Sequence, residues 1–139
     1  MAETAIELTS GAKSVRDGLR RALRGPPFDR LAMADRSNAE IVLAEVLNNI
    51  AEHAYAGRPG PIWLWVAREP GRLCLRVEDE GRPMPGHRLP PDRLPVPGDL
   101  AEGGFGWHLI RALASDLRYD RCGSLNRLCF HLRTEQSAG

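Results

Sequence analysis

Hydrophobic residues recur at helical spacing from Ser37 to Ala56, which is the strongest helix signal in the chain. Gaps of three and four residues place them in one stripe along a helix. Ser37 and Glu40 match a capping box, which predicts that the helix begins there, and Gly57 is suited to end it. The stripe consists of Val42, Leu43, Val46, Leu47, Ile50 and Ala54.

A second line of residues on this predicted helix is mostly polar. Ile41, Glu45, Asn49 and His53 follow one another at intervals of four, so their side chains stack along one face. A carboxylate, an amide and an imidazole beside an apolar stripe are candidate side chains for catalysis or ligand binding. A solvated helix face would give the same pattern, and a histidine near a helix C-terminus also interacts favourably with the helix dipole.

Alternating hydrophobic and polar residues predict strands that form two hairpins. Pro70 and Gly71 suit a type II turn in the first hairpin. A short N-terminal strand and two further helices complete the expected elements. The expected strands are 5–9, 62–68, 72–78, 117–121 and 127–132, and the further helices are 12–23 and 106–115.

A carboxylate is expected on the apolar side of the strand 72–78. Leu73, Leu75 and Val77 point one way, and continuing the alternation places Asp79 with them. Burial of a carboxylate without a partner is costly. Asp79 therefore either binds something or caps a turn through its side chain.

The segment 81–104 is rich in Pro, Gly and Arg and shows little periodicity, so we expect a long loop of the kind that often forms a lid. It ends at Gly103 and Gly104, with Gly106 close behind, at the head of a predicted helix. Glycines there can expose backbone N–H groups to a phosphate, although many such glycines only form a turn.

Composition narrows the function classes. The chain has 139 residues and a net charge of +1, which suits a single globular domain and gives no general electrostatic reason to bind nucleic acid or an anionic membrane. The three cysteines form no regular framework, and Cys74 and Cys129 lie in apolar runs where a core position is expected. No signal peptide or membrane span is indicated, so we expect a cytoplasmic protein.

The order and spacing of these features resemble the GHKL ATPase superfamily, whose fold is shared by histidine kinases and gyrase-type ATPases. Ala44–Tyr55 looks like the N-box, Val77–Pro83 like the first glycine box and Gly103–Ile110 like the second. Gly123–Leu128 resembles the closing hairpin of the family. The resemblance covers about Ile6 to Arg133 and is nearest to the single-domain anti-sigma factor serine/threonine-protein kinases of bacteria.

The resemblance implies a role for each polar residue of the boxes. Glu45 would be the catalytic base, and Asn49 would coordinate Mg²⁺ on the ATP phosphates. Asp79 would receive the adenine amino group, and Gly81 would let the backbone approach the base. The remaining implied ATP contacts are His53, Gly103, Gly104, Phe105 and Gly106, and the lid arginines Arg88 and Arg93 are candidates for phosphate contacts.

Two positions depart from the pattern of the family. Pro83 stands where a second glycine is frequent, and Trp107 stands where a smaller apolar residue is usual. Trp107 would either pack under the lid or lie at a partner surface. Neither change removes a group that would touch ATP.

The implied fold is α/β (α+β), a two-layer sandwich with a mixed, mostly antiparallel sheet and helices on one face, known as the Bergerat-type ATP-binding fold. One domain would span residues 1–133, with the lid at about 82–104 and a flexible tail at 134–139. Homodimerisation is possible, with the N-terminal strand and the helix after it as a candidate surface.

The implied function is an ATP- and Mg²⁺-dependent serine/threonine-protein kinase in transcription regulation. Its partners would be a small anti-sigma factor antagonist of STAS type, a sigma factor, or both. One alternative is a non-catalytic, nucleotide-dependent binding module. A less favoured alternative is a histidine phosphotransfer protein with His53 or His108 as the acceptor.

Overall fold

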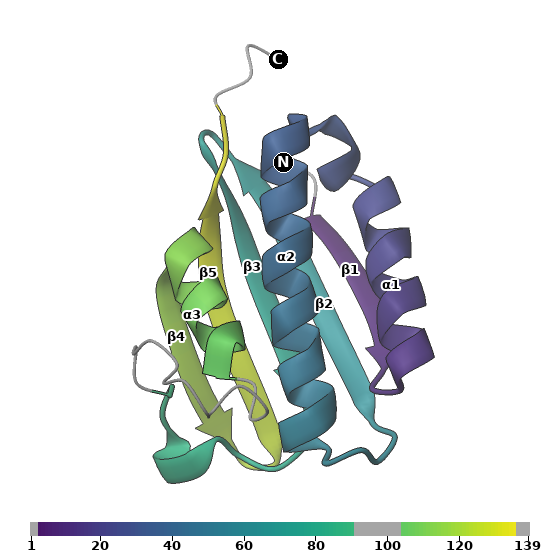
Figure 1. Ribbon diagram of the computed structural model, residues 1–139, viewed down its shortest axis with the longest axis vertical. Coiled ribbons are helices and arrows are strands. Elements are labelled where there is room, and N and C mark those ends of the chain that lie inside the picture. The colour runs from purple at the N-terminus through teal and green to yellow at the C-terminus, as the bar shows by residue number, and fades with distance from the viewer. Residues whose placement is uncertain (1–2, 91–103, 136–139) are drawn as a thin grey trace.

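The described residues form three α-helices and five strands in the order that the hydrophobic pattern predicts (Figure 1). The computed structural model describes residues 3–90 and 104–135. Two of the shorter helical turns, η1 and η3, are 3₁₀ turns, and η2 is a π-helical turn. The elements are β1 (Glu3–Thr9), α1 (Ala12–Arg24), η1 (Phe28–Arg30), α2 (Met33–Asn49), η2 (Ile50–Ala54), β2 (Pro61–Glu69), β3 (Arg72–Asp79), η3 (Pro85–His87), α3 (Gly104–Leu113), β4 (Ala114–Cys122) and β5 (Leu125–Arg133).

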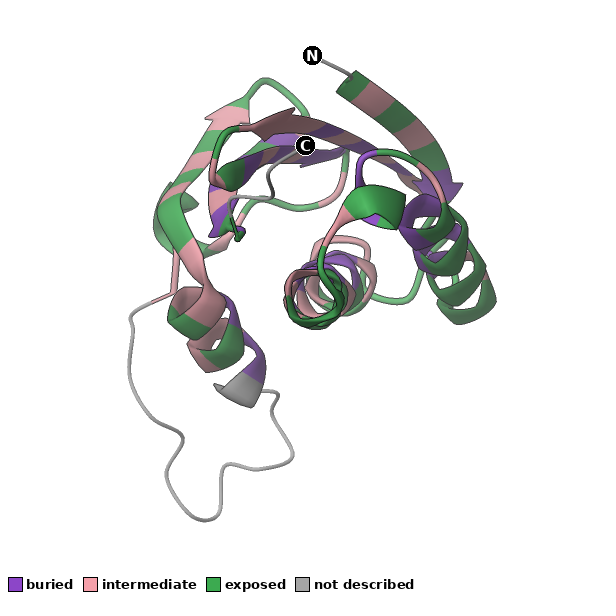
Figure 2. Ribbon diagram, turned by 90° about the horizontal axis from the view of Figure 1, so that it is seen from above, coloured by how far each residue is buried: buried purple, intermediate pink, exposed green. Residues whose placement is uncertain are grey.

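The strands form one sheet in the order β1-β2-β3-β5-β4. Each of the four strand pairs is antiparallel. The three α-helices lie on the same side of this sheet, and the opposite side carries no described helix (Figure 2). The predicted two-layer α+β architecture is confirmed, with a sheet that is antiparallel rather than mixed.

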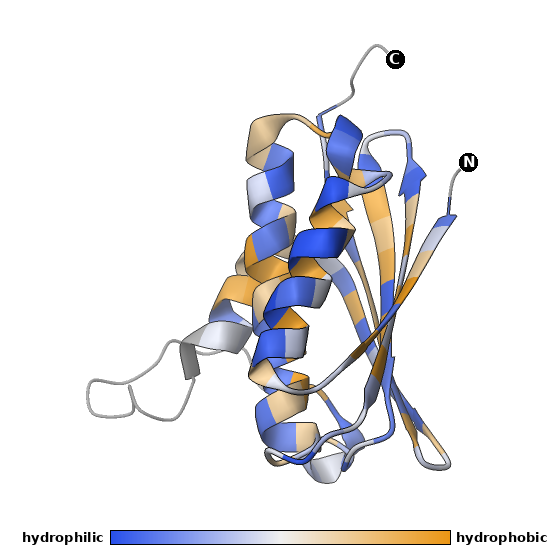
Figure 3. Cartoon of the chain, turned by 90° about the vertical axis from the view of Figure 1, so that its right-hand side faces the viewer, coloured by the Kyte–Doolittle hydropathy of each residue, from blue (hydrophilic) through white to orange (hydrophobic). Residues whose placement is uncertain are grey.

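The hydrophobic core lies between the helix layer and the sheet. Strand residues that face the helices alternate with more exposed ones. Hydrophobic and hydrophilic positions alternate along the strands in the same way (Figure 3). This alternation is expected where only one face of a sheet is covered. Among the described residues, no helix is long and apolar enough to cross a membrane. The largest fully buried side chains are Phe28, Phe130, Leu43, Leu47, Ile62, Leu64, Leu73 and Ile110.

The central helix begins earlier than the sequence predicts. The predicted helix start at Ser37 is wrong. Helix α2 starts at Met33, and its N-cap residue, Ala32, makes no side-chain capping bond. Tertiary contacts hold this first turn instead. Nε of Arg36 donates to the carbonyl of Leu23 (3.0 Å), and Oδ2 of Asp35 accepts the N–H of Glu135 (2.8 Å).

The central helix also ends differently from the prediction, which extended a regular α-helix to Ala56. After Asn49 the chain makes the π-helical turn η2, in which the N–H of Tyr55 reaches back five residues to the carbonyl of Ile50 (2.9 Å). Gly57 then adopts a positive φ of 82°, as a helix-ending glycine is expected to do. π-Helical turns are rare and frequently occur at functional sites.

This turn packs directly against the loop that follows β3. The carbonyl of Ala54 accepts the N–H of Arg82 (2.7 Å), and Nη2 of Arg82 donates to the carbonyl of His53 (3.0 Å). A Cβ atom on Gly81 would lie 2.6 Å from the backbone of Ala54, so only glycine allows this approach. The π-helical turn and the first glycine box therefore form one packed unit.

Other boundaries and positions also differ from the expected ones. Helix α3 ends at Leu113 rather than near Ser115, because β4 begins at Ala114 and pairs with Leu132 of β5. Cys74 and Cys129 are not core residues. They are half-buried on the uncovered face of the sheet, because they alternate with inward-facing leucine and phenylalanine residues.

The C-terminal segment beyond β5 is partly held in place. Thr134 is buried and donates its backbone N–H to the carbonyl of Gly71 (2.9 Å). Of the segment 134–139 expected to be a tail, only Thr134 and Glu135 lie within the described residues.

Tyr55 joins three segments near the glycine-box loop, and removal of its hydroxyl should destabilise the protein. The hydroxyl donates to the carbonyl of Pro61 (2.6 Å) and accepts the N–H of Glu80 (2.7 Å). Loss of such bonds costs about 1–3 kcal/mol, so Tyr55→Phe should lower Tm by about 5–10 °C. Thermal unfolding measures this change, and an unchanged Tm would show that water replaces both contacts.

Candidate functional site

A cavity of about 640 Å³ lies between the end of α2, the segment that follows β3, helix α3 and the β4–β5 hairpin. Its lining comes from both layers of the fold and combines apolar surface with a few polar groups, as ligand sites generally do. The lining residues are Val46, Asn49, Ile50, His53, Ala54, Asp79, Arg82, Pro83, Met84, Pro85, Pro90, Trp107, Tyr119, Asn126 and Leu128.

Asp79 is the carboxylate of this cavity, and it is only 4% exposed. It ends β3 on the inward-facing side, as the strand alternation predicts. Its Oδ1 atom accepts the N–H of Gly81 (2.8 Å) and Nδ2 of Asn126 (2.8 Å). Burial raises the pKa of Asp79, while these hydrogen bonds and the charge of Arg121 act in the opposite direction.

Glu45 and Asn49 meet helix α3 at its first turn. A Cβ atom on Gly106 would lie 2.7 Å from Oε2 of Glu45 and 3.7 Å from both amide atoms of Asn49. Gly106 is buried, and the two polar side chains come from successive turns of α2. A carboxylate and an amide therefore converge on the backbone of a helix N-terminal turn, next to the cavity.

The other predicted site residues are distributed unevenly around this arrangement. His53 lines the cavity and is exposed, and Gly81 forms the close backbone contact with the π-helical turn. Arg88 is exposed and does not line the cavity. Gly104 and Phe105 are the first two residues of α3. Gly103 and Arg93 lie outside the described residues.

The segment that follows β3, where the sequence predicts a lid, contains the 3₁₀ turn η3 and is hydrogen-bonded to β4 and α3. The N–H of Met84 donates to the hydroxyl of Tyr119 (2.9 Å), and Nη2 of Arg111 donates to the carbonyl of Pro90 (2.8 Å). Trp107 lines the cavity together with Pro90 and packs against the core.

Sequence reasoning missed the β4–β5 hairpin as a source of polar site residues. Asn126 is 5% exposed and faces Asp79, while Tyr119 and Arg121 contact its side-chain oxygen. The signal was available in the sequence, because the alternation of Leu128, Phe130 and Leu132 places Asn126 on the same inward side. The argument that identified Asp79 applies equally to Asn126.

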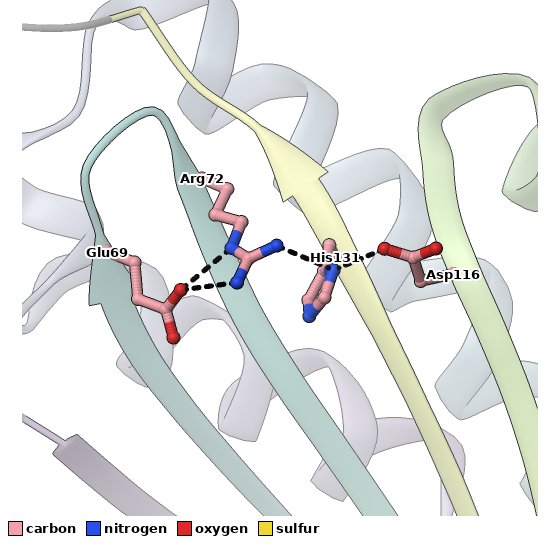
Figure 4. A network of polar contacts seen from close by, with 4 residues as sticks. All are labelled: Glu69, Arg72, Asp116 and His131. Atoms are coloured by element: carbon pink, nitrogen blue, oxygen red, sulfur yellow. Dashed lines mark hydrogen bonds and ion pairs between the residues drawn. The ribbon is translucent and has the colours of Figure 1, made fainter.

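A second polar network lies on the uncovered face of the sheet, at the end far from Asp79 (Figure 4). Nη2 of Arg72 contacts Oε1 of Glu69 (2.7 Å), and Nδ1 of His131 contacts Oδ2 of Asp116 (2.8 Å). Arg72 lowers the pKa of Glu69 by hydrogen bonding. Exposed ion pairs of this kind add little stability, and the network touches none of the cavity residues.

No group of three or more His, Cys, Asp or Glu side chains is arranged to hold a metal ion in the described ranges 3–90 and 104–135. The three cysteines are free thiols.

Gly106→Ala should displace the Glu45 carboxylate while leaving the fold intact. The new methyl group would contact the far end of a flexible side chain, and alanine is the better helix residue by about 1 kcal/mol. Tm should therefore be unchanged or slightly higher. Gly11→Ala is the matched control, because nothing lies within 4 Å of its Cβ position. If Glu45 acts in catalysis, turnover should fall at least about tenfold, since small misplacements are costly.

The geometry defines a class of nucleotide-binding protein. The fold is an α+β sandwich with helices on one face of the sheet. Its cavity contains a buried carboxylate, and a polar helix face and a helix that begins with glycine lie beside it. These features suit the binding of a nucleotide base and of its phosphates. The sequence profile described as histidine kinase-like ATPase domain matches residues 8–132. The chain therefore belongs to the histidine kinase-like ATPase domain family, and this membership implies ATP binding.

One solved structure shares this fold. The chain is similar to the RsbU and RsbW domains of Rv1364c from Mycobacterium tuberculosis, with 18% identity and a TM-score of 0.62. That match covers 96% of this chain and 33% of the other, so this chain spans about one third of its solved neighbour. The Acinetobacter baumannii histidine kinase AdeS matches at 18% identity and a TM-score of 0.46, over 97% of this chain and 68% of that one. No curated protein matches the chain.

Proposed function

We propose that this chain is an ATP-dependent serine/threonine-protein kinase of the anti-sigma factor type. The observation that carries the proposal is the meeting of Glu45 and Asn49 at Gly106, beside a cavity that contains Asp79. A carboxylate at the phosphate end is what a kinase needs and a simple nucleotide-binding module does not. The resemblance of the three sequence boxes to bacterial anti-sigma kinases supports the choice within the family.

Asp79 would bind the base and Glu45 would act on the attacking group. The Oδ2 atom of Asp79 accepts no hydrogen bond from the described residues, so it can accept one from the adenine amino group. Glu45 would take the proton of a serine or threonine hydroxyl on one of its carboxylate oxygens. Phosphoryl transfer depends mainly on such positioning and on charge stabilisation.

The residues present also fit a magnesium ion held jointly with the phosphates. Nδ2 of Asn49 is buried without a hydrogen-bond partner among the described residues, so the amide has unused hydrogen-bonding capacity at this point. Its Oδ1 atom is a neutral oxygen ligand of the kind that Mg²⁺ accepts, and Mg²⁺ usually takes few protein ligands. When bound, the ion would neutralise charge on the phosphates.

The lid would supply further phosphate contacts. Backbone amides of Gly103, Gly104, Phe105 and Gly106 are candidates because they lead into the N-terminus of α3, where an anion is favoured. Arg88 and Arg93 remain candidates as well. We further propose a STAS-type antagonist protein or a sigma factor as the partner, with possible homodimerisation and a cytoplasmic location.

The proposal is tested by phosphoryl transfer from γ-labelled ATP. The purified chain, Mg²⁺ and a candidate STAS-type antagonist should yield acid-stable label on a serine or threonine of the antagonist. Bound ATP without transfer to any candidate would favour the non-catalytic binding module. Acid-labile phosphohistidine at His53 or His108, formed after the chain is mixed with a phosphorylated regulator, would favour the histidine phosphotransfer alternative.

A further inference from the structure

Asp79 and Asn126 form a buried pair at the base-binding end of the cavity. They lie directly opposite each other in the register of β3 and β5, and they are 4% and 5% exposed. Nδ2 of Asn126 donates to Oδ1 of Asp79 at 2.8 Å. Because Oδ1 also accepts the N–H of Gly81 (2.8 Å), the protein itself satisfies that oxygen.

The amide of Asn126 can adopt only one orientation in this environment. Its Oδ1 atom accepts from the Tyr119 hydroxyl (2.5 Å) and from Nη1 of Arg121 (3.0 Å). Its Nδ2 atom faces the Asp79 carboxylate and the carbonyl of Arg82 (2.9 Å). A flipped amide would place donor against donor on one side and acceptor against acceptor on the other.

Tyr119 and Arg121 are themselves held in place. The Tyr119 hydroxyl accepts the N–H of Met84 (2.9 Å), so its single proton is directed to Asn126. Nη1 of Arg121 also donates to the carbonyl of Gly81 (2.6 Å). The network therefore connects the end of β3, the start of the lid and the β4–β5 hairpin, and it fixes the plane of the Asp79 carboxylate.

We propose that Asn126 is a positioning residue that sets base selectivity, by holding Asp79 ionised with its second oxygen available to the cavity. This inference rests on the proposed function, because it concerns the base of the bound nucleotide. Asn126 has its donors and acceptors occupied by protein groups and acts through Asp79 rather than on the base itself.

Selectivity follows from what the base presents to the free carboxylate oxygen. Adenine presents an amino group, which donates to an ionised carboxylate. Hypoxanthine and guanine present a carbonyl oxygen at the same ring position. An ionised carboxylate repels this oxygen, whereas a protonated carboxyl would donate a hydrogen bond to it. A site that holds the carboxyl ionised therefore selects adenine, and partial protonation weakens that selection.

The charged surroundings of Asp79 determine how easily it protonates. Burial raises its pKa, and the hydrogen bonds from Asn126 and Gly81 oppose this, as does the Arg121 charge from β4. Tyr119 from β4 and His53 from the π-helical turn also line the cavity. The pKa of Tyr55 is raised chiefly by burial and to a lesser extent by the charge of Asp79. Arg82 lines the cavity and Glu80 lies beside Asp79 in the chain. Loss of the Asn126 bond should raise the pKa of Asp79 further.

The test compares binding of ATP and ITP to the wild-type chain and to Asn126→Ala, across pH values from about 5 to 8. The wild-type chain should prefer ATP. The variant should bind ATP about tenfold to a hundredfold more weakly than the wild type, as loss of a hydrogen bond to a charged group implies. Its affinity for ITP should fall by a smaller factor. Its preference for ATP should fall further at lower pH. If Asn126 had only a structural role, its loss would weaken the binding of ATP and of ITP by the same factor at every pH.

Two further variants keep the inference falsifiable. Tyr119→Phe removes only the hydroxyl that orients the amide, and it should lower the ATP-to-ITP ratio by a smaller factor. Arg127→Gln is the control. Arg127 follows Asn126 in β5 but lies on the other face of the sheet, and the substitution breaks its ion pair with Glu78 of β3 (2.6 Å). It should lower Tm and leave the ratio unchanged.

The outcomes separate this inference from the function on which it rests. An unchanged ATP-to-ITP ratio in both Asn126→Ala and Tyr119→Phe overturns the role of Asn126 while leaving ATP binding and phosphotransfer in place. The same holds if the wild-type chain binds ATP and ITP equally. If the wild-type chain binds no ATP, the proposed function fails and this inference fails with it.

Discussion

Replacement of Glu45 by Gln should reduce phosphoryl transfer about 10²–10⁴-fold and leave ATP binding nearly unchanged, as expected for loss of a general base. The amide keeps the size of the side chain, so the contact with Gly106 at the start of α3 is preserved. What it loses is the ability to take a proton from the attacking hydroxyl. Single-turnover transfer of label from ATP to the partner measures the rate, and calorimetry measures binding.

Glu40→Gln provides the matched control for this experiment. Glu40 is an exposed residue of the same helix, five positions earlier, and it does not line the cavity. Its replacement removes the same charge from α2 without touching the site. Equal transfer rates in Glu45→Gln and Glu40→Gln would rule out Glu45 as the catalytic base.

Asp79→Asn should weaken ATP binding about tenfold to a hundredfold while leaving the ligand-free protein as stable as the wild type or more so. The amide oxygen can still accept from Gly81 and Asn126, but the group that faces the cavity becomes a donor, which opposes the amino group of adenine. Burial raises the pKa of Asp79, so the ionised carboxylate costs free energy in the folded state.

The stability difference should depend on pH in a defined direction. At pH values above the raised pKa of Asp79, the wild-type carboxyl is ionised and bears the burial cost, which the amide of the variant avoids. As the pH falls through the raised pKa of Asp79, the wild-type carboxyl becomes neutral and the gap in Tm should close. Thermal unfolding without nucleotide, at several pH values, checks this. If Asp79→Asn has a lower Tm than the wild type at neutral pH, the Asp79 carboxylate stabilises the ligand-free fold, which would contradict this prediction.

The layer architecture and the inward position of Asp79 followed from periodicity. Strand alternation needs no tertiary information, because side chains of period two have only two faces to choose between. It placed Leu73, Leu75, Val77 and Asp79 on the covered side of the sheet, where all four are buried. The expectation for Cys74 and Cys129 was wrong because it followed local hydrophobicity rather than this alternation, which places both on the uncovered face.

Helix boundaries were less predictable because distant residues set them. The Ser37 capping box is a valid local signal, but Arg36 and Asp35 bind Leu23 and Glu135 and extend α2 by four residues. The π-helical turn also leaves no clear mark in the sequence, since it depends on packing against the loop at Gly81. Contacts between segments far apart in the chain override local propensity in both cases.

The candidate site could be predicted in part. The boxes located Glu45, Asn49 and Asp79, but the meeting of the first two at Gly106 depends on how α3 packs against α2. The Asn126 network depends on the register of β3 and β5, which a hairpin pattern alone does not give because these strands are not consecutive. The missing information was thus the relative placement of elements rather than the residues themselves.

The π-helical turn at 50–54 makes the site sensitive to chain length. A π-turn contains one residue more than an α-helix would use to cover the same path. Deleting one residue there, even the exposed Glu52, would restore α-helical winding and rotate the carbonyls of His53 and Ala54 by about 100°. The bonds from Arg82 would then have no acceptors. Insertions and deletions in this turn should therefore be tolerated far less than substitutions, although it lies at the protein surface.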